Sequence, residues 1–119
     1  MPVVNTYYRE PRFFADLSAA SPALQTYVAE QLTCGDRILQ PHEVSIRLLE
    51  ALGKSMLANV EMDIFAASYQ DRVDNQDQIC RNVKQFVLEH VSGLEDTNVW
   101  LMLGELGHSA EEPSSEPET

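Results

Sequence analysis

The opening segment MPVVNTYYRE (residues 1–10) carries the residue best suited to chemistry, a proline directly after the initiator methionine. Met1 is normally removed when a small residue follows it, and its removal would leave Pro2 with a free secondary amine. Burial in an apolar site lowers the pKa of such an amine toward neutrality, where a base moves protons most efficiently. We therefore predict that Pro2 is a general base that takes a proton from the carbon beside a carbonyl. The alternative is a strand-edge proline with no chemical role.

Two arginines are candidates for holding the carboxylate of an acidic substrate, because a guanidinium binds a carboxylate through two parallel hydrogen bonds. Arg47 lies within an apolar strand pattern, and Arg72 lies near a predicted helix start. Arg47 has an alternative role in an ion pair, within the chain or across a subunit boundary, with Glu50, Glu61 or Asp63. Arg72 has an alternative role as a solvated side chain. Both are predicted here to bind substrate.

Further candidates lie on or beside the predicted strands. We predict Arg9 and Trp100 as additional substrate-binding residues, and other aromatic side chains that could wall the site are Tyr7, Tyr8 and Phe65. Aromatic residues on strands usually belong to a core or an interface, which is the alternative for each of them. The three histidines and two cysteines show no metal-ligand spacing, so we predict neither a metal nor a cofactor.

Length and composition limit the class of protein. The chain has 119 residues, enough for one domain, and its net charge of −11 argues against DNA or RNA as a partner. No apolar run approaches the roughly 20 residues that span a membrane, and no secretory signal is visible. Cys34 and Cys80 are expected to be reduced, buried thiols, so we predict a cytoplasmic protein. The segment 109–119, SAEEPSSEPET, is predicted to be a disordered acidic tail.

Hydrophobic periodicity predicts two amphipathic helices and four strands. The first helix is expected to start at Ser21-Pro22, where a capping oxygen precedes a first-turn proline, and to end at Gly35. The second helix is expected to end at Gly93 and has an apolar stripe made of Ile79, Val83, Phe86, Val87 and Val91. The strands are expected at residues 3–8, 43–51, 59–67 and 98–106.

The order of these elements is β-α-β, used twice, and the two strands that follow the helices are similar. Residues 44–55 read VSIRLLEALGKS, and residues 99–109 read VWLMLGELGHS. We therefore predict a duplicated unit, with repeats at about 2–55 and 58–108 of one domain that spans residues 1–108. The predicted fold class is α+β, a four-stranded sheet with two helices on one face. The other face would stay apolar and uncovered, so we expect oligomerisation to bury it.

The sequence resembles the tautomerase superfamily. The segment DRVDNQDQ (71–78) is similar to the Gly-Arg-Ser/Thr-Asp-Glu-Gln-Lys motif of that family, and Arg72, Asp74 and Gln76 fall on the Arg, Asp and Gln of the motif. Pro2 falls on the N-terminal catalytic proline of the family. The two tandem units resemble the branch that contains 5-carboxymethyl-2-hydroxymuconate isomerase and macrophage migration inhibitory factor (MIF). The resemblance implies a homotrimer, with a central barrel of sheets, helices outside and sites at subunit boundaries.

The resemblance also implies an activity, that of a cofactor-independent tautomerase or isomerase. Its ligand would be a small-molecule carboxylate, a 2-oxo acid whose enol and keto forms it interconverts. Ser45 and Trp100 stand where the family often has a strand arginine, and Arg47, two residues beyond Ser45, is a possible substitute. Two alternatives stay open. One is a hydratase, dehalogenase or decarboxylase that uses a protonated Pro2, and the other is a non-catalytic tautomerase-fold or ferredoxin-like binding protein.

Overall fold

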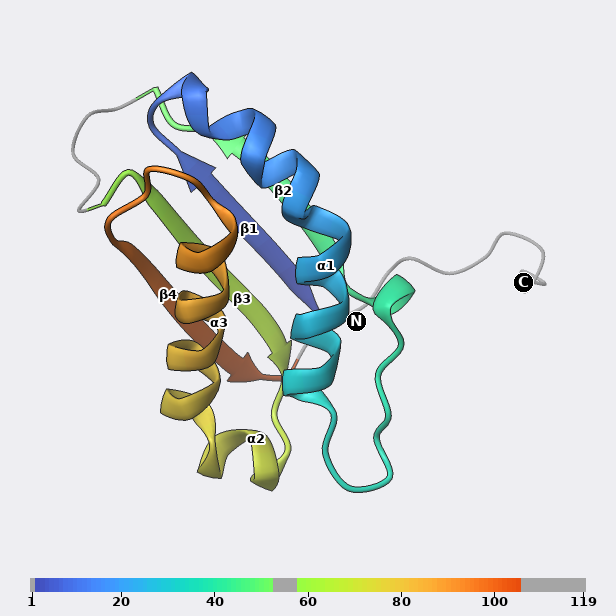
Figure 1. The fold of residues 1–119 in the computed structure, drawn as a ribbon. Helices are drawn as coiled ribbons and strands as arrows, with labels where there is room; N and C mark the ends of the chain where they lie inside the picture. The colour runs from blue at the N-terminus through green and yellow to red at the C-terminus, as the bar shows by residue number, and fades with distance from the viewer. Residues whose placement is uncertain (1, 53–57, 106–119) are drawn as a thin grey trace, which may run out of the picture.

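The computed structural model describes residues 2–52 and 58–105, which form one mixed sheet and two main helices (Figure 1). The predicted acidic tail and most of the predicted boundary between the repeats lie outside the described residues. Within the described residues, no helix is both long enough and apolar enough to cross a lipid bilayer.

Each half of the fold is a β-α-β unit. In the first, α1 (Phe14–Leu32) connects the parallel strands β1 (Val3–Tyr8) and β2 (Ser45–Glu50). In the second, α3 (Gln76–His90) connects the parallel strands β3 (Val60–Ala67) and β4 (Thr97–Gly104). Antiparallel pairing of β1 with β3 joins the halves in the strand order β2-β1-β3-β4. The predicted α+β class and tandem repeats are therefore confirmed.

Three short elements complete the described chain. Two single 3-10 turns, η1 (Pro11–Phe13) and η2 (Pro41–Glu43), precede α1 and β2, and α2 (Gln70–Asp74) precedes α3. Each 3-10 turn starts with a proline, whose fixed φ suits a first helical position and whose missing N–H would have no partner there.

Both α1 and α3 lie on the same face of the sheet (Figure 1). The strands present alternate side chains to this face, most regularly in β3, where buried and half-buried residues alternate throughout. The core combines this face with the apolar stripes of the two helices, and its largest fully buried side chains include Phe13, Leu32, Met62 and Ile64. The opposite face carries no described helix, as the sequence predicted.

The predicted start of the first helix is wrong. α1 begins at Phe14 and continues through Pro22, which has no N–H to donate to the carbonyl four residues earlier. The apolar stripe explains the longer helix, because Leu17 and Phe13 lie about one and two turns ahead of the predicted start and are both almost fully buried. Burying two such side chains contributes about 3–6 kcal/mol, which offsets a cost of roughly 3 kcal/mol for an interior proline.

The prediction that the first helix ends at Gly35 is also wrong in detail. α1 ends at Leu32, and Thr33 already has an extended backbone with ψ of 130°. Gly35 has φ of +54° and lies in a separate turn beyond the helix. Gly93, with φ of +78°, lies in the turn that follows α3, close to its predicted place.

Candidate active site

Pro2 lies at the end of the sheet where β1 starts and where β3 and β4 finish (Figure 1). It is buried, and its carbonyl oxygen accepts a hydrogen bond from the Ser45 backbone N–H at 3.0 Å. This bond extends the β1–β2 ladder by one residue and fixes the proline against the sheet. The predicted base therefore has a defined position in the fold.

A pocket of about 350 Å³ lies at the same end of the sheet. Its walls come from the α1–β2 connection, the end of β3 and the start of α2: Asp36, Arg37, Ile38, Leu39, Glu43, Ala67, Tyr69 and Arg72. Ala67 ends β3 two residues beyond Phe65, the partner of Val3, so this wall of the pocket lies beside the start of β1. Pro2 directly precedes Val3 and so lies near this wall, but it is not one of the residues that line the pocket. The volume is within the range of small-molecule sites.

The loop that carries Arg37 is held at its base by hydrogen bonds. Thr33 follows α1 directly, and its hydroxyl oxygen accepts the Leu39 N–H at 3.0 Å. Cys34 and Arg37 exchange two backbone hydrogen bonds across the turn that contains Gly35, whose positive φ is a conformation that favours glycine. Arg37 is thereby presented on the outside of a fixed turn, with an exposed side chain.

The ring of Tyr69 contacts two arginines at this pocket. The guanidinium carbon of Arg37 lies 4.6 Å from the ring centroid, and that of Arg72 lies 4.8 Å from it. Such cation–π contacts orient the guanidinium and contribute about 0.5–1 kcal/mol at exposed sites. Within the described part of the chain, the Arg37 side chain makes no hydrogen bond or ion pair. Its N–H donors therefore remain available to a ligand.

Arg72 has a structural position that neither of its predicted roles anticipated. Its side chain is buried, with a relative exposure of 4%. Its Nε donates to the Leu32 carbonyl oxygen at 2.9 Å and its Nη1 donates to the Ala67 carbonyl oxygen at 2.9 Å. Arg72 thus joins the last residue of α1 to the last residue of β3, and it places a positive charge at the negative end of the α1 dipole. The predicted alternative of a solvated side chain is wrong.

Two carboxylates share the pocket with these cations. Glu43 closes a capping box, in which its Oε2 accepts the Gln40 backbone N–H at 3.3 Å. Asp36 is exposed and precedes Arg37 in the turn. A pocket that contains a guanidinium and two carboxylates can bind an anionic group and exchange protons with water.

Arg47 and Trp100 lie away from this pocket, on the face of the sheet that no described helix covers. The strand pairing puts Arg47 opposite Asn5, Asn5 opposite Asp63, and Asp63 opposite Trp100, so the four side chains form one row across the sheet. Arg47 is exposed, and Trp100 retains 43% of its surface exposure. Within one chain, neither Arg47 nor Trp100 lines the pocket near Pro2.

Arg9 lies at the opposite end of β1 from Pro2, roughly 20 Å away along the strand. Its Nε donates to the Asn59 side-chain oxygen at 3.1 Å, and its Nη2 donates to the same oxygen. Its backbone N–H also donates to the Asn59 carbonyl oxygen at 3.0 Å. These contacts connect the ends of β1 and the start of β3, which is a structural role within the chain.

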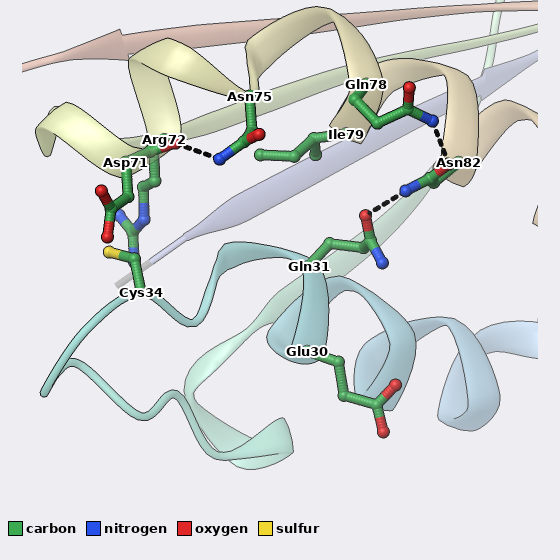
Figure 2. A pocket seen from close by; sticks show the side chains of 9 residues that line it. All are labelled: Glu30, Gln31, Cys34, Asp71, Arg72, Asn75, Gln78, Ile79 and Asn82. Carbon is green, nitrogen blue, oxygen red and sulfur yellow. Dashed lines mark hydrogen bonds between the residues drawn. The ribbon is translucent and has the colours of Figure 1, made fainter.

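A second cavity, of about 200 Å³, lies between the end of α1 and the α2–α3 segment (Figure 2). Amide side chains line it and bond to one another: Asn82 donates to Gln31 at 2.9 Å, and Gln78 donates to Asn82 at 2.7 Å. Figure 2 shows Cys34 beside Asp71 and Arg72 at one end of this cavity. Pro2 lines neither cavity, and we place the candidate active site at the larger pocket because its wall at Ala67 lies beside the start of β1, where Pro2 is.

Sequence reasoning missed Arg37, Tyr69 and Glu43. A usable signal existed in the topology, because the connection that follows the helix of a β-α-β unit returns to the edge where the first strand starts. This topology predicts that the residues between α1 and β2 lie near Pro2, and Arg37 is the arginine among them. Among the described residues, no three metal-ligating side chains gather in one place.

Comparison with known proteins identifies the fold. No family model and no curated protein matches the sequence. The structure is similar to a macrophage migration inhibitory factor-like protein from Entamoeba histolytica, with a TM-score of 0.59, 9% identity and coverage of 88% of each chain. It is also similar to Leishmania major MIF2, with a TM-score of 0.56, 13% identity, and coverage of 92% of this chain and 94% of that one.

A third similar structure is N1, a member of the cis-3-chloroacrylic acid dehalogenase family. Its TM-score is 0.54 with 18% identity, and the alignment covers 87% of this chain and 74% of N1. These identities are low, so the likeness is one of fold. The chain has the two-repeat fold of the MIF-like proteins, as the resemblance to the tautomerase superfamily predicted.

Proposed function

We propose that this protein is a cofactor-independent tautomerase of small 2-oxo acids, with Pro2 as the general base. The observation that carries the proposal is the position of Pro2, buried at the same end of the sheet as a pocket that contains the Arg37 guanidinium, which makes no hydrogen bond or ion pair among the described residues. Burial disfavours the protonated amine, which keeps the nitrogen able to accept a proton. The MIF-like fold supports the same reading.

In the proposed reaction, Arg37 binds the substrate carboxylate and Pro2 acts on the adjacent carbon skeleton. The Pro2 nitrogen takes a proton from the carbon beside the carbonyl, and the electron pair of that C–H bond moves to the carbonyl oxygen as an enolate. The proton then returns to another carbon of a conjugated substrate, or water protonates the oxygen to give the enol. The positive charge of Arg37 stabilises the enolate as it forms.

The test is the ketonisation of phenylenolpyruvate or 2-hydroxymuconate, followed by absorbance. Pro2→Ala is expected to lower kcat/KM by about 100-fold or more, in the range of a lost general base. Arg37→Met is expected to lower it by about 10- to 100-fold, mainly through KM, because a charge-assisted contact to the substrate is lost. Pro11→Ala and Arg81→Met, which change exposed residues away from the pocket, are the matched controls.

The intact mass of the purified protein decides whether the nitrogen is free. A protein that has lost Met1 is expected. Retention of Met1, or full activity in Pro2→Ala, would contradict the proposal and would favour a non-catalytic binding protein with this fold.

A second candidate reaction is the addition of water to an unsaturated acid, with a protonated Pro2. Its supporting observation is the pair of carboxylates, Asp36 and Glu43, in the same pocket as Arg37. A carboxylate would take a proton from water, the hydroxide would add to the carbon–carbon double bond, and protonated Pro2 would supply the proton to the other carbon. Three results together would favour this candidate. The wild-type protein would release halide from 3-chloroacrylate, Glu43→Gln would lose this activity, and the wild-type protein would be inactive on enols.

We also propose that the protein is a homotrimer in the cytoplasm. The support is the sheet face that no described helix covers, which carries Leu49, Trp100 and Met102 as exposed apolar side chains. Closing three such sheets on one another would bury these side chains and would bring neighbouring chains to the sheet end near Pro2. Light scattering on the purified protein measures the number of copies.

A further inference from the structure

The cavity between the end of α1 and the α2–α3 segment has features of a second binding site, separate from the one proposed for catalysis. Its volume of about 200 Å³ suits a molecule smaller than a drug-sized ligand. Figure 2 shows the charged side chains of Asp71 and Arg72 at one end of the cavity. At the other end it shows the amide side chains of Gln31, Gln78 and Asn82.

The guanidinium of Arg72 is held in place and has one nitrogen without a partner. Its Nε and Nη1 donate to the carbonyl oxygens of Leu32 and Ala67, and its central carbon lies 4.8 Å from the centroid of the Tyr69 ring. Within residues 2–52 and 58–105, Nη2 makes no hydrogen bond. It is also not among the unpartnered atoms that are closed to solvent. Arg72 lines this cavity as well as the candidate active-site pocket, so a fixed, charged N–H donor is available to an anionic oxygen there.

The carboxylate of Asp71 lies beside this guanidinium but is not paired with it. Among the described residues, the Asp71 side chain forms no ion pair and accepts no hydrogen bond. The bond from Asn75 Nδ2, at 2.8 Å, goes to the Asp71 backbone carbonyl oxygen instead. Glu30, the other carboxylate of the lining, points away from Asp71 in Figure 2. One end of the cavity thus holds a free carboxylate and a free guanidinium nitrogen that are neighbours without being bonded to each other.

The amide end of the cavity is a directional row of hydrogen bonds. Gln78 accepts a bond from Arg81 at 3.1 Å and donates one to Asn82 at 2.7 Å. Asn82 then donates to the side-chain oxygen of Gln31 at 2.9 Å. The row ends at Gln31 Nε2, whose two N–H groups have no acceptor among the described residues. An amide has more donors and acceptors than these bonds use, so this wall suits an uncharged polar group.

We propose that this cavity binds a free α-amino acid with an uncharged polar side chain. Its carboxylate binds Arg72 Nη2, its ammonium group binds the Asp71 carboxylate, and its side chain lies against the amide row. An amino acid carries both charges on one carbon, which matches two opposite charges at one end of the cavity. A simple anion would leave the Asp71 carboxylate beside it as a repulsion, and a simple amine would leave the guanidinium unpaired. The buried, apolar Ile79 is the part of the lining that the methylene groups of the ligand contact.

The test is a titration of the isotope-labelled protein with L-glutamine, followed by the NMR shifts of its backbone amides. Saturable shifts are expected at residues 30–34 and 71–82, with a dissociation constant of about 1 mM or below. Two analogues each remove one charge: 4-aminobutanamide lacks the carboxylate of glutamine, and glutaramate lacks its ammonium group. Each should bind at least about 10-fold more weakly, because it leaves one charged side chain of the cavity without a partner.

One matched pair of variants locates the site. Asp71→Asn is expected to weaken glutamine binding at least about 10-fold while the circular dichroism spectrum stays unchanged. Asp77→Asn, which changes an exposed carboxylate in the first turn of α3 outside the cavity lining, should bind like the wild type. Pro2→Ala should also bind like the wild type, so this inference stands or falls separately from the proposed catalysis.

Three results would each overturn the proposal. The first is the absence of saturable shifts with glutamine, asparagine or serine up to about 10 mM. The second is binding of either analogue as tightly as glutamine, which would indicate a site for an anion or an amine alone. The third is an Asp71→Asn protein that binds glutamine as tightly as the wild type.

Discussion

Replacing Arg72 with methionine tests whether this arginine stabilises the fold or binds substrate. Arg72→Met keeps an unbranched apolar stem of similar reach but removes both donors, leaving the Leu32 and Ala67 carbonyl oxygens without them. A hydrogen bond to a charged group contributes about 1.5–3 kcal/mol, and a stranded buried acceptor adds its own cost. Methionine recovers part of this, because burying a guanidinium is itself unfavourable. We expect a net loss of about 3 kcal/mol.

The assay is urea denaturation and thermal melting at one fixed protein concentration, since an oligomer melts at a temperature that depends on concentration. For a domain of this size, 1 kcal/mol corresponds to about 3–6 °C, so the melting temperature should fall by about 10–15 °C. Arg72→Lys should lose about half as much, because one ammonium group cannot reach both carbonyls. Arg81→Met, at an exposed position on α3, should change stability by less than about 0.5 kcal/mol.

The result that would refute this reasoning is a fully stable Arg72→Met protein. If its melting temperature stays within about 2 °C of wild type while KM rises at least about tenfold, Arg72 binds substrate, as the sequence motif suggested. The two hydrogen bonds to Leu32 and Ala67 would then be incidental to stability.

Two further predictions concern the turn after α3 and the uncovered sheet face. Gly93→Ala should lower the free energy of unfolding, measured by urea denaturation, by about 1–2 kcal/mol, because φ is +78° and a Cβ would lie 3.3 Å from Arg12 Nη1. Gly104→Ala is the control and should leave the free energy of unfolding almost unchanged, because its Cβ would have nothing within 4 Å. Because the pKa of Asp63 is raised in the folded chain, its carboxylate lowers stability as pH rises through that pKa. At a protein concentration low enough to keep the chain unassembled, Asp63→Asn should therefore raise the melting temperature more at about pH 7 than at about pH 4, and an equal effect at both would contradict the shift.

The strands were predictable because their signal is local. Val60, Met62 and Ile64 alternate with Glu61 and Asp63, as in a strand with two different faces, and β3 (Val60–Ala67) contains all five residues. The first strand was predicted at residues 3–8, and β1 (Val3–Tyr8) has those bounds. The second strand was predicted three residues too long and the third strand one residue too long, and the fourth was predicted to start one residue later than it does. Strand ends depend on which backbone groups find partners, and that is decided by neighbouring strands rather than by the strand's own residues.

The start of α1 was not predictable from the same kind of signal. A serine followed by a proline is a common helix start, and nothing local reveals that Leu17 already packs into a core. Burial of that earlier turn depends on the sheet beneath it, so tertiary contacts overrode the local preference. The two-repeat order was still recovered, because it requires only that a helix exists between the paired strands.

The candidate site divides into residues that topology could predict and residues that it could not. The place of Pro2 follows from its position ahead of β1, and that of Arg37 follows from the crossover that brings the α1–β2 connection back to the same edge. The burial of Arg72 does not follow, because its two acceptors lie 40 and 5 positions away in the sequence. A motif that looks like an exposed polar helix start therefore contains a buried structural arginine.

Arg72 also bears on the chemistry proposed for Pro2, through the α1 dipole. The carboxyl end of α1 lies near the pocket, because Arg72, which lines the pocket, bonds to the Leu32 carbonyl oxygen. The helix dipole is negative at this end and favours a positive charge nearby, which would hold a proton on the Pro2 nitrogen. Arg72 bonds to the last carbonyl of α1 and supplies that positive charge itself. Removing it should therefore move the acid limb of the kcat/KM–pH profile to higher pH, since the nitrogen then gives up its proton less readily. Arg72→Met protein that stays folded at low temperature allows this measurement, and an acid limb at the wild-type pH would show that the helix end does not influence the base.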